Sequence, residues 1–277
     1  MSVLVASYNI HFGVGADGLS DLERIAAEVD QADIICLQEV AQYVVDHTDQ
    51  FQALVDILEL FGVYGSTLDV AGPADHLTAR GRFGNAVLSR WPILTTRTIP
   101  LPAPPLADMF DPARCAVEAV IDAPDGPLRV VSVHLSHLSA ERRFGQVKRL
   151  LEEFEQSPVA ALAWSGSNAL SDGRPAPLVP VGGIICGDFN MEPGEAGYEL
   201  IVGEWMEGVG RLTRVGGLVD AFSGEADRIP TYVGMAGAAA TPLVIDHIFH
   251  TNDLGVEEAW VGSAAIGSDH LPIFVRL

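Results

Sequence analysis

Short apolar runs rich in β-branched residues alternate along the chain with stretches in which apolar residues recur every three or four positions. The apolar runs predict strands at residues 3–7, 33–37, 85–89, 116–121, 128–133, 183–186, 243–249, 256–260 and 273–276. The helical spacing predicts helices at residues 21–30, 49–61, 141–155 and 195–201. Strands and helices are intermixed, and some strands follow one another as hairpins. This order indicates an α+β fold in which two packed β-sheets are flanked by helices.

No internal repeat and no long linker interrupts the pattern, so one domain that spans residues 1–277 is expected. The segment at residues 165–180 is rich in Ser, Gly and Pro and predicts an exposed excursion. It is either a flap that selects the substrate or a long surface loop.

The charge of the chain restricts its partners. Hydrophobic residues make up 48% of the sequence, which indicates an ordered core, and the 37 acidic and 16 basic residues give a net charge of −21. Nucleic-acid binding depends on Lys and Arg that displace counterions from phosphates, so this charge disfavours DNA, RNA and anionic membranes. It also leaves carboxylates for a hard cation such as Mg²⁺, Mn²⁺ or Ca²⁺.

Targeting and redox features of the sequence are few. The chain begins without a basic leader, and no apolar run approaches the roughly 20 residues that a membrane span needs. We therefore expect no transmembrane segment and a cytoplasmic location. Cys36, Cys115 and Cys186 lie in apolar, strand-like surroundings and form no CxxC pair, which predicts buried free thiols.

Polar residues gather where the predicted strands end. Residues 187–190 (GDFN) follow an apolar strand, and strand alternation directs the side chains of Asp188 and Asn190 to the same side. A carboxylate beside an amide suits the holding of a water molecule and an oxyanion. A strand followed by a turn with Asx capping is the alternative interpretation.

Histidines follow the same pattern. His134 ends an apolar strand and either contacts a phosphate oxygen or caps the strand structurally. A zinc site with His137 is disfavoured because no third ligand follows at typical spacing. His270 follows Asp269 just before the last strand, and Asp246 on another strand is a carboxylate able to orient an imidazole base.

One acidic residue remains at a predicted strand end. Glu39 follows residues 33–37 and is either a ligand for a hard cation or a solvated loop acid.

Taken together, these motifs resemble the endonuclease/exonuclease/phosphatase superfamily, also called deoxyribonuclease-I-like. The matching stretches occur in the order of that family, and they are residues 7–11 (SYNIH), 37–40 (LQEV), 84–90 (GNAVLSR), 132–135 (SVHL), 187–190 (GDFN), 245–248 (IDHI) and 267–272 (GSDHLP). The resemblance covers nearly the whole chain. It implies a four-layer αββα sandwich and Mg²⁺-dependent hydrolysis of a phosphoester, with Mn²⁺ or Ca²⁺ as other candidate ions.

The resemblance also implies where the metal and the phosphate bind. Glu39 matches the principal metal ligand, with Asn9 beside it in the first or second coordination shell. Asp269 matches a residue that contacts the same or a second metal. His134 matches a residue that binds a non-bridging phosphate oxygen, and Arg114 sits where some relatives place a phosphate-contacting arginine.

The catalytic roles are implied in the same way. Asp188 matches the residue that positions or deprotonates the attacking water, and Asn190 holds that water or a phosphate oxygen. His270, oriented by Asp246, acts as a base or stabilises the pentavalent transition state.

The substrate is less closely specified. The pattern from Asn9 to residue 26 is similar to that of the bacterial branch near sphingomyelinases and small-molecule phosphodiesterases. We therefore favour a small or lipid-derived phosphodiester or phosphomonoester as substrate. A DNA or RNA nuclease is the alternative, and a catalytically inactive binding protein of the same fold is a third reading. The sequence specifies no oligomeric state.

Overall fold

The computed structural model describes residues 2–43, 48–71, 80–160, 164, 172–173, 175–214, 217–222, 228–235, 237 and 240–277. The helices are η1 (His11–Gly13), α1 (Leu22–Val29), α2 (Gln50–Leu58), α3 (Ala140–Ala160) and α4 (Ala196–Val202). The strands are β1 (Leu4–Asn9), β2 (Ile34–Gln42), β3 (Phe61–Ala71), β4 (Arg80–Ser89), β5 (Ile93–Leu101), β6 (Arg114–Ala123), β7 (Gly126–His134), β8 (Ile184–Asp188), β9 (Trp205–Met206), β10 (Gly210–Arg211), β11 (Leu218–Asp220), β12 (Asp246–Thr251), β13 (Glu258–Val261) and β14 (Ile273–Arg276).

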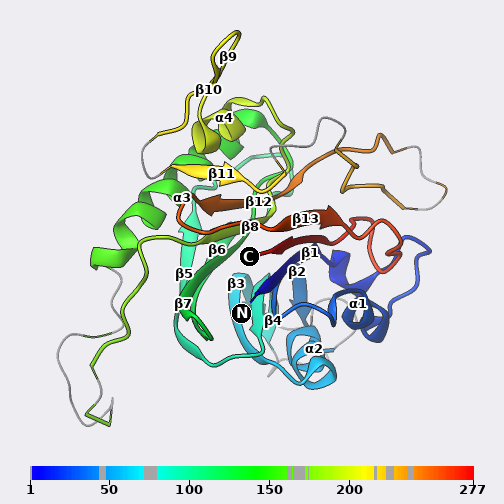
Figure 1. The fold of residues 1–277 in the computed structure, drawn as a ribbon. Helices are drawn as coiled ribbons and strands as arrows, with labels where there is room; N and C mark the ends of the chain where they lie inside the picture. Colours follow the sequence, from blue (N-terminus) through cyan, green and yellow to red (C-terminus); the bar gives the residue numbers. More distant parts are fainter. Residues whose placement is uncertain are drawn as a thin grey trace.

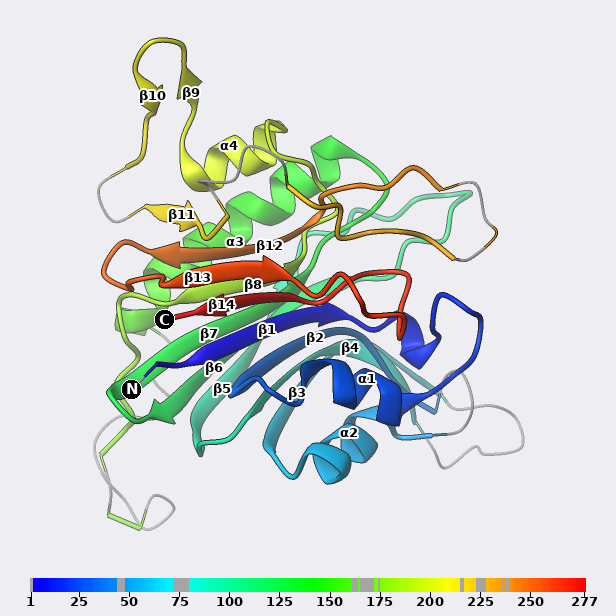
Figure 2. The same cartoon turned by 45° about the vertical axis from the view of Figure 1, so that its right-hand side comes forward.

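Two six-stranded mixed sheets form the centre of the molecule. One has the order β13-β14-β1-β2-β4-β3 and the other the order β11-β12-β8-β7-β6-β5. Helices α1 and α2 cover the outer face of the first sheet, and α3 and α4 lie on the second (Figures 1 and 2). The expected four-layer αββα sandwich is confirmed.

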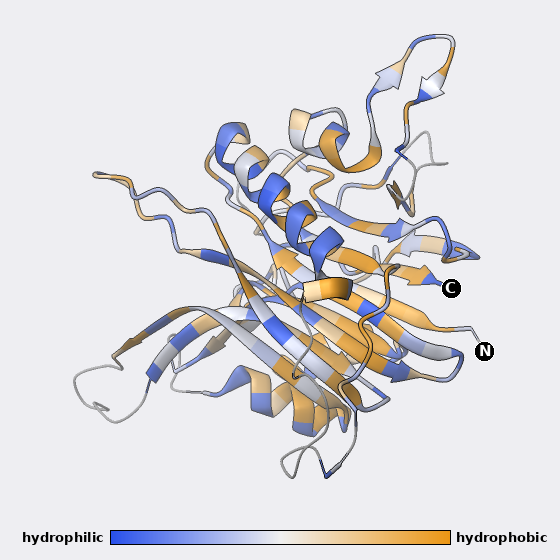
Figure 3. Ribbon diagram, turned by 90° about the vertical axis from the view of Figure 1, so that its left-hand side faces the viewer, coloured by the Kyte–Doolittle hydropathy of each residue, from blue (hydrophilic) through white to orange (hydrophobic). Residues whose placement is uncertain are grey.

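Three apolar clusters hold these layers together. The inner faces of both sheets meet in one cluster, in which Val5 and Cys36 of the first sheet pack with Val117 and Cys186 of the second. The outer face of each sheet packs on its own helix pair in a further cluster. Figure 3 shows mostly hydrophobic strands beneath the largely hydrophilic outward surface of α3. Burial on both faces explains why the central strands are continuous apolar runs in the sequence.

Strand direction brings the polar strand ends together. β1 pairs with β2 in parallel, and β7 pairs with β8 in parallel, so the carboxyl ends of each pair share one edge. β14 runs antiparallel to β1, and β12 runs antiparallel to β8, so their amino ends reach that same edge. Chain segments far apart in the sequence therefore deliver their polar residues to one place.

The sequence pattern missed five strands, which are the short β9, β10 and β11 and the longer β3 and β5. β3 and β5 are edge strands of their sheets, and most of their residues are partly buried or exposed. Neither has the continuous apolar run that marks a central strand. α3 also continues beyond the predicted end at residue 155 and contains Pro158 near its carboxyl end.

The structure also describes the three cysteines and the apolar character of the helices. All three cysteines are buried free thiols, as predicted. Among the described residues no helix is both long and apolar enough to cross a membrane. Half of the predicted excursion at residues 165–180 lies outside the described residues, which include 172–173 and 175–180 of it.

Candidate active site

A cavity of about 350 Å³ lies at the edge where the strand ends converge. Seven of the nine residues singled out in the sequence line it, and they are Glu39, Arg114, His134, Asp188, Asn190, Asp269 and His270. The other two, Asn9 and Asp246, are buried and hydrogen-bonded to the lining residues. The tertiary structure therefore brings all nine candidate residues together.

A bulge in β2 directs Glu39 into the cavity. The pairing of β2 with β4 shifts register between Leu37 and Val40, and Glu39 has a φ of 58°. A left-handed conformation costs a glutamate on the order of 1 kcal/mol, and such strain persists where the surrounding structure enforces it. Glu39 Oε2 is buried and has no hydrogen-bond partner among the described residues. Burial raises the pKa of this carboxyl.

The turn at residues 187–190 differs from the expected strand. β8 ends at Asp188, and Asn190 has a left-handed φ of 51°, so strand alternation does not place the two side chains. A turn does so instead, because the Asn190 N–H donates to Asp188 Oδ1 at 2.9 Å. Gly187 is required, since a Cβ atom there would lie 1.8 Å from the Val133 carbonyl oxygen. The Asx interpretation is therefore correct, and it is this turn that presents both side chains to the cavity.

Asp246, His270 and Asp188 form a buried relay. His270 Nδ1 lies 2.9 Å from Asp246 Oδ2, and its Nε2 lies 3.8 Å from Asp188 Oδ2. Burial opposes a charge on His270, but Asp246 and Asp188 outweigh this effect and raise its pKa to about 10. Burial raises the pKa of Asp188 to about 7, although the nearby His270 charge acts in the opposite direction.

His134 lies against the turn at residues 187–190. Its Nε2 is 3.2 Å from Asn190 Nδ2 and 3.2 Å from Asp188 Oδ2, while its Nδ1 has no hydrogen-bond partner among the described residues. Burial and the positive charge of Arg114 lower the pKa of His134 well below its usual value. The imidazole is therefore neutral at neutral pH and can offer one N–H donor.

Asn9 positions its neighbours. Its Nδ2 donates to Asp188 Oδ2 at 2.9 Å, and its Oδ1 accepts the His11 N–H at 3.0 Å. Ser268 Oγ donates to the Asn9 carbonyl oxygen at 2.7 Å, which ties the loop that carries His270 to the end of β1. Both polar groups of the Asn9 side chain thus hold protein atoms.

Arg114 supplies a buried positive charge. Its Nη2 lies 3.2 Å from His137 Nδ1, whereas its Nε and Nη1 are buried without hydrogen-bond partners among the described residues. Burial and the charge of Arg114 lower the pKa of His137, so a neutral imidazole accepts this bond and orients the guanidinium. Two unpaired N–H groups of a buried guanidinium fit an oxyanion.

Comparison with known families agrees with this geometry. The model of the endonuclease/exonuclease/phosphatase family matches residues 6–270. The chain belongs to this family. No curated protein matches the sequence closely enough to narrow the family further. The nearness to the sphingomyelinase branch stays a prediction.

Solved structures of the endonuclease/exonuclease/phosphatase family share the fold. One from Beutenbergia cavernae has a TM-score of 0.70 at 22% identity, over 99% of this chain and 71% of that chain. The mannosyl-6-phosphatase Bt3783 of Bacteroides thetaiotaomicron has a TM-score of 0.66 at 18% identity, over 99% and 98%. The human Nocturnin catalytic domain with bound sulfate has a TM-score of 0.64 at 21% identity, over 99% and 93%.

Several residues of this family member's cavity received no role in the sequence. Tyr232, Leu243 and Ile245 line it beside His270. Leu243 and Ile245 lie in the predicted strand at residues 243–249, and Ile245 begins the IDHI motif, but none of the three was assigned a function. His11, which ends the SYNIH motif, and Phe12 also line it. Only proximity to the SYNIH and IDHI motifs could have indicated these positions, because apolar lining residues look like core residues in a sequence.

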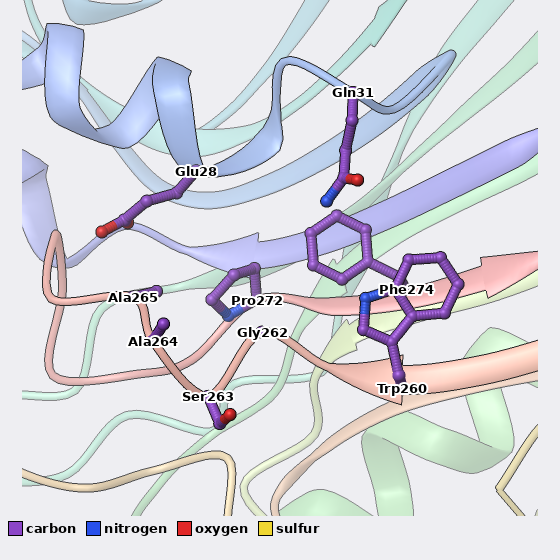
Figure 4. Close-up of a pocket in the computed structure, with 9 residues that line it drawn as sticks. All are labelled: Glu28, Gln31, Trp260, Gly262, Ser263, Ala264, Ala265, Pro272 and Phe274. Atoms are coloured by element: carbon purple, nitrogen blue, oxygen red, sulfur yellow. The ribbon is translucent and has the colours of Figure 1, made fainter.

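Glu28 of α1 anchors the loop that precedes His270. Its carboxylate accepts the Ile266 N–H at 2.7 Å, the Gly267 N–H at 2.9 Å and the Tyr8 hydroxyl at 2.7 Å. Figure 4 shows Glu28 reaching toward this loop at a second pocket, which is walled by Trp260. α1 therefore holds both β1 and the His270 loop.

The relay predicts how the stability of the metal-free protein depends on pH. Folding raises the pKa of His270 from 6.5 to about 10, so its stabilising charge is fully present below pH 6.5 and is lost as the pH rises through 10. Folding also raises the pKa of Asp188, from 3.8 to about 7, so the folded state binds more protons than the unfolded state. Its contribution to stability therefore also falls as the pH rises, in this case between 3.8 and about 7. In EDTA, the free energy of unfolding should fall as the pH rises from 6.5 to 10.

Urea titrations across this range measure the effect. His270→Gln is expected to flatten the decrease, whereas His250→Gln, which alters a buried histidine of β12 outside the cavity, should preserve it. Equal slopes for wild type and His270→Gln would contradict the assignment.

Proposed function

We propose that this protein is a divalent-metal-dependent hydrolase that cleaves a small-molecule or lipid-derived phosphoester by attack of a water molecule. The observation that carries the proposal is the Asp246–His270–Asp188 relay beside Glu39 Oε2 and Arg114 Nε and Nη1, three buried atoms without hydrogen-bond partners among the described residues. A proton relay, an anionic cation site and an oxyanion site are the three parts that phosphoester hydrolysis requires.

The donor set at Glu39 fits a hard cation. Its Oε2 is buried and unpaired, and the Asp269 carboxylate is near enough to raise the pKa of Glu39 further. Two carboxylates in a partly buried cleft suit Mg²⁺ or Mn²⁺. When bound, the cation neutralises phosphate oxygens and the charge that develops in the transition state. Asn9, whose amide is engaged with Asp188 and His11, orients the site from behind it.

A second group of possible ligands has a different role in this proposal. Ligand atoms of Asp188, Asp246 and His270 lie within 4.8 Å of one another, which is close enough for one ion. The pairing of His270 Nδ1 with Asp246 Oδ2 at 2.9 Å disfavours that use, because these two atoms already hold each other. We therefore assign these three residues to proton transfer.

Each residue of the relay has a defined task. Asp188 accepts the proton of the attacking water through an oxygen that is deprotonated above about pH 7. His270 remains protonated at neutral pH and stabilises the negative charge of the transition state, which favours this role over that of a base. Asp246 holds its imidazole in position through Nδ1. Neutral His134 and Arg114 donate to phosphate oxygens, and the side-chain oxygen of Asn190 accepts from the water, since the Asn190 amide nitrogen is engaged with Leu135 and His134.

Small substrates are favoured over nucleic acids. Arg114 is the only Lys or Arg among the described residues that line the cavity, and the whole chain carries a net charge of −21. The mannosyl-6-phosphatase named above shows that a small phosphomonoester is a substrate within this fold. A nuclease is the second candidate, supported by the breadth of the family itself.

Turnover of chromogenic esters tests the proposal. The protein should release p-nitrophenol from bis-p-nitrophenyl phosphate or p-nitrophenyl phosphate when Mg²⁺ or Mn²⁺ is added, and EDTA should stop the release. The absence of metal-stimulated release from both esters would favour a binding protein of the same fold. Efficient Mg²⁺-dependent nicking of plasmid DNA at physiological salt would favour the nuclease.

A further inference from the structure

The cavity has an apolar wall next to the catalytic histidine. We propose that Phe12, Tyr232 and Leu243 form the subsite for the organic group of the substrate, and that this group is apolar and carries no second anionic charge. The inference rests on the proposed hydrolysis of a phosphoester and narrows its substrate class.

Tyr232 lies directly against the relay. Its ring meets the His270 ring edge to face, with centroids 5.1 Å apart and an interplanar angle of 62°. Its backbone N–H donates to the Leu243 carbonyl oxygen at 3.0 Å, and the Leu243 N–H donates back at 3.1 Å. These paired bonds hold the two side chains side by side. Any group attached to a phosphate at His270 must therefore lie near Tyr232.

Phe12 lines the same cavity from the turn that follows β1. His11 and Phe12 have φ values of 43° and 54°, and Gly13 continues the turn at 75°. A left-handed phenylalanine is a strained residue that persists only where other contacts enforce it. Here buried Gln50 supplies that contact, because its Nε2 donates to the Phe12 carbonyl oxygen at 2.6 Å and its Oε1 accepts the Ala41 N–H.

Packing of the ring into the core does not explain the left-handed backbone of Phe12. The centroids of the Phe12 and Phe83 rings are 5.2 Å apart. The Phe12 side chain is nevertheless half-buried and lines the cavity rather than entering the core. A buried glutamine thus holds a strained backbone so that an aromatic ring faces the cavity. An aromatic and aliphatic wall binds a flat or aliphatic group by removing apolar surface from water.

The charges of the cavity exclude a second anion on that group. Arg114 is the single guanidinium among the described lining residues, and it lies near His137, Asp188 and Glu39. The wall itself offers one polar side-chain group, the Tyr232 hydroxyl. The positive charge of His270 is already paired with Asp246 at 2.9 Å, and the cation proposed at Glu39 serves the reacting phosphate. A carboxylate or a second phosphate at the wall would therefore meet no unpaired cation among the described residues and would lie close to Asp269.

Binding of non-hydrolysable phosphonates tests this subsite without catalysis. Isothermal titration calorimetry with Mg²⁺ present compares methylphosphonate, phenylphosphonate and 4-carboxyphenylphosphonate on the full chain. We expect phenylphosphonate to bind about tenfold more tightly than methylphosphonate because the wall buries its ring. The added carboxylate should weaken phenylphosphonate binding about tenfold. Equal or tighter binding of the carboxylated compound would overturn the inference.

Variants separate the wall from the rest of the site. Tyr232→Ala and, as a second variant in case the first fails to fold, Leu243→Ala should lower the phenyl-to-methyl affinity ratio toward one. Tyr232→Phe should keep the ratio. Trp205→Ala, which removes an exposed ring of β9 outside the cavity, is the matched control and should also keep it.

Two failures are distinguishable. If the wild type binds methylphosphonate but shows no preference for the phenyl group, or if folded wall variants keep the full preference, the apolar subsite is wrong and the proposed hydrolysis stands. If the wild type binds none of the phosphonates and releases no p-nitrophenol, the proposed function itself fails.

Discussion

Replacement of His270 by alanine is expected to lower kcat for metal-stimulated ester hydrolysis by about 10³-fold or more. The loss arises because His270 is the only member of the relay that carries a positive charge at neutral pH, with a pKa raised to about 10. Without that charge, Asp188 and Asp246 are two buried carboxylates that no longer have an imidazolium between them.

The measurement is kcat and KM for the chromogenic ester that the wild type turns over. KM should change little if His270 stabilises the transition state but not the bound substrate. His250→Ala is the matched control, because His250 is also a buried histidine but lies outside the cavity. Circular dichroism must show that His270→Ala is folded. A folded variant with wild-type kcat would remove His270 from the mechanism.

The second large effect is expected at Glu39, where activity and stability should change in opposite directions. Glu39→Gln keeps the shape of the side chain but removes the charge that the proposed cation needs, so kcat should fall by about 10³-fold or more. In EDTA the same variant should be more stable than the wild type. Burial raises the pKa of Glu39, and its Oε2 has no partner among the described residues, so the ionised form is destabilising without a cation.

Thermal unfolding with EDTA and with Mg²⁺ measures both effects. In EDTA the Tm of Glu39→Gln should exceed that of the wild type by about 2–4 °C, the shift expected for about 1 kcal/mol in a chain of this size. Added Mg²⁺ should raise the Tm of the wild type but not that of the variant. Glu258→Gln, an exposed glutamate of β13, is the control and should respond to Mg²⁺ as the wild type does. A variant still stabilised by Mg²⁺ would place the metal elsewhere.

The relation of sequence to structure is clearest at residues 187–190. Both sequence interpretations, the Asx-capped turn and the polar pair, prove to be one arrangement, because the Asn190 N–H bond to Asp188 is what presents the two side chains. The alternation argument was wrong in its geometry, since β8 ends at Asp188. No sequence pattern could indicate the left-handed backbone of Asn190 or that of Glu39.

Local physics determined much of this protein directly from its sequence. Central strands are buried on both faces, so they are continuous apolar runs in the sequence. Helices show apolar residues with a 3.6-residue period, and polar residues at strand ends are distinct from both patterns. Those signals were sufficient for two packed sheets flanked by helices and for the polar residues at the strand ends. The four-layer order and the choice of Arg114 came from the family resemblance. The edge strands β3 and β5 were missed because partial exposure removes the apolar run.

Only the tertiary structure decided how those residues act together. The distance between Asp188 and His270, the contact of Tyr232 with His270, and the unpaired atoms of Glu39 and Arg114 all join segments far apart in the chain. A pKa depends on burial and on neighbouring charges, and neither exists until the two sheets pack. The sequence therefore indicated the candidate residues, whereas packing set their pKa values and formed the apolar wall that we propose selects the substrate.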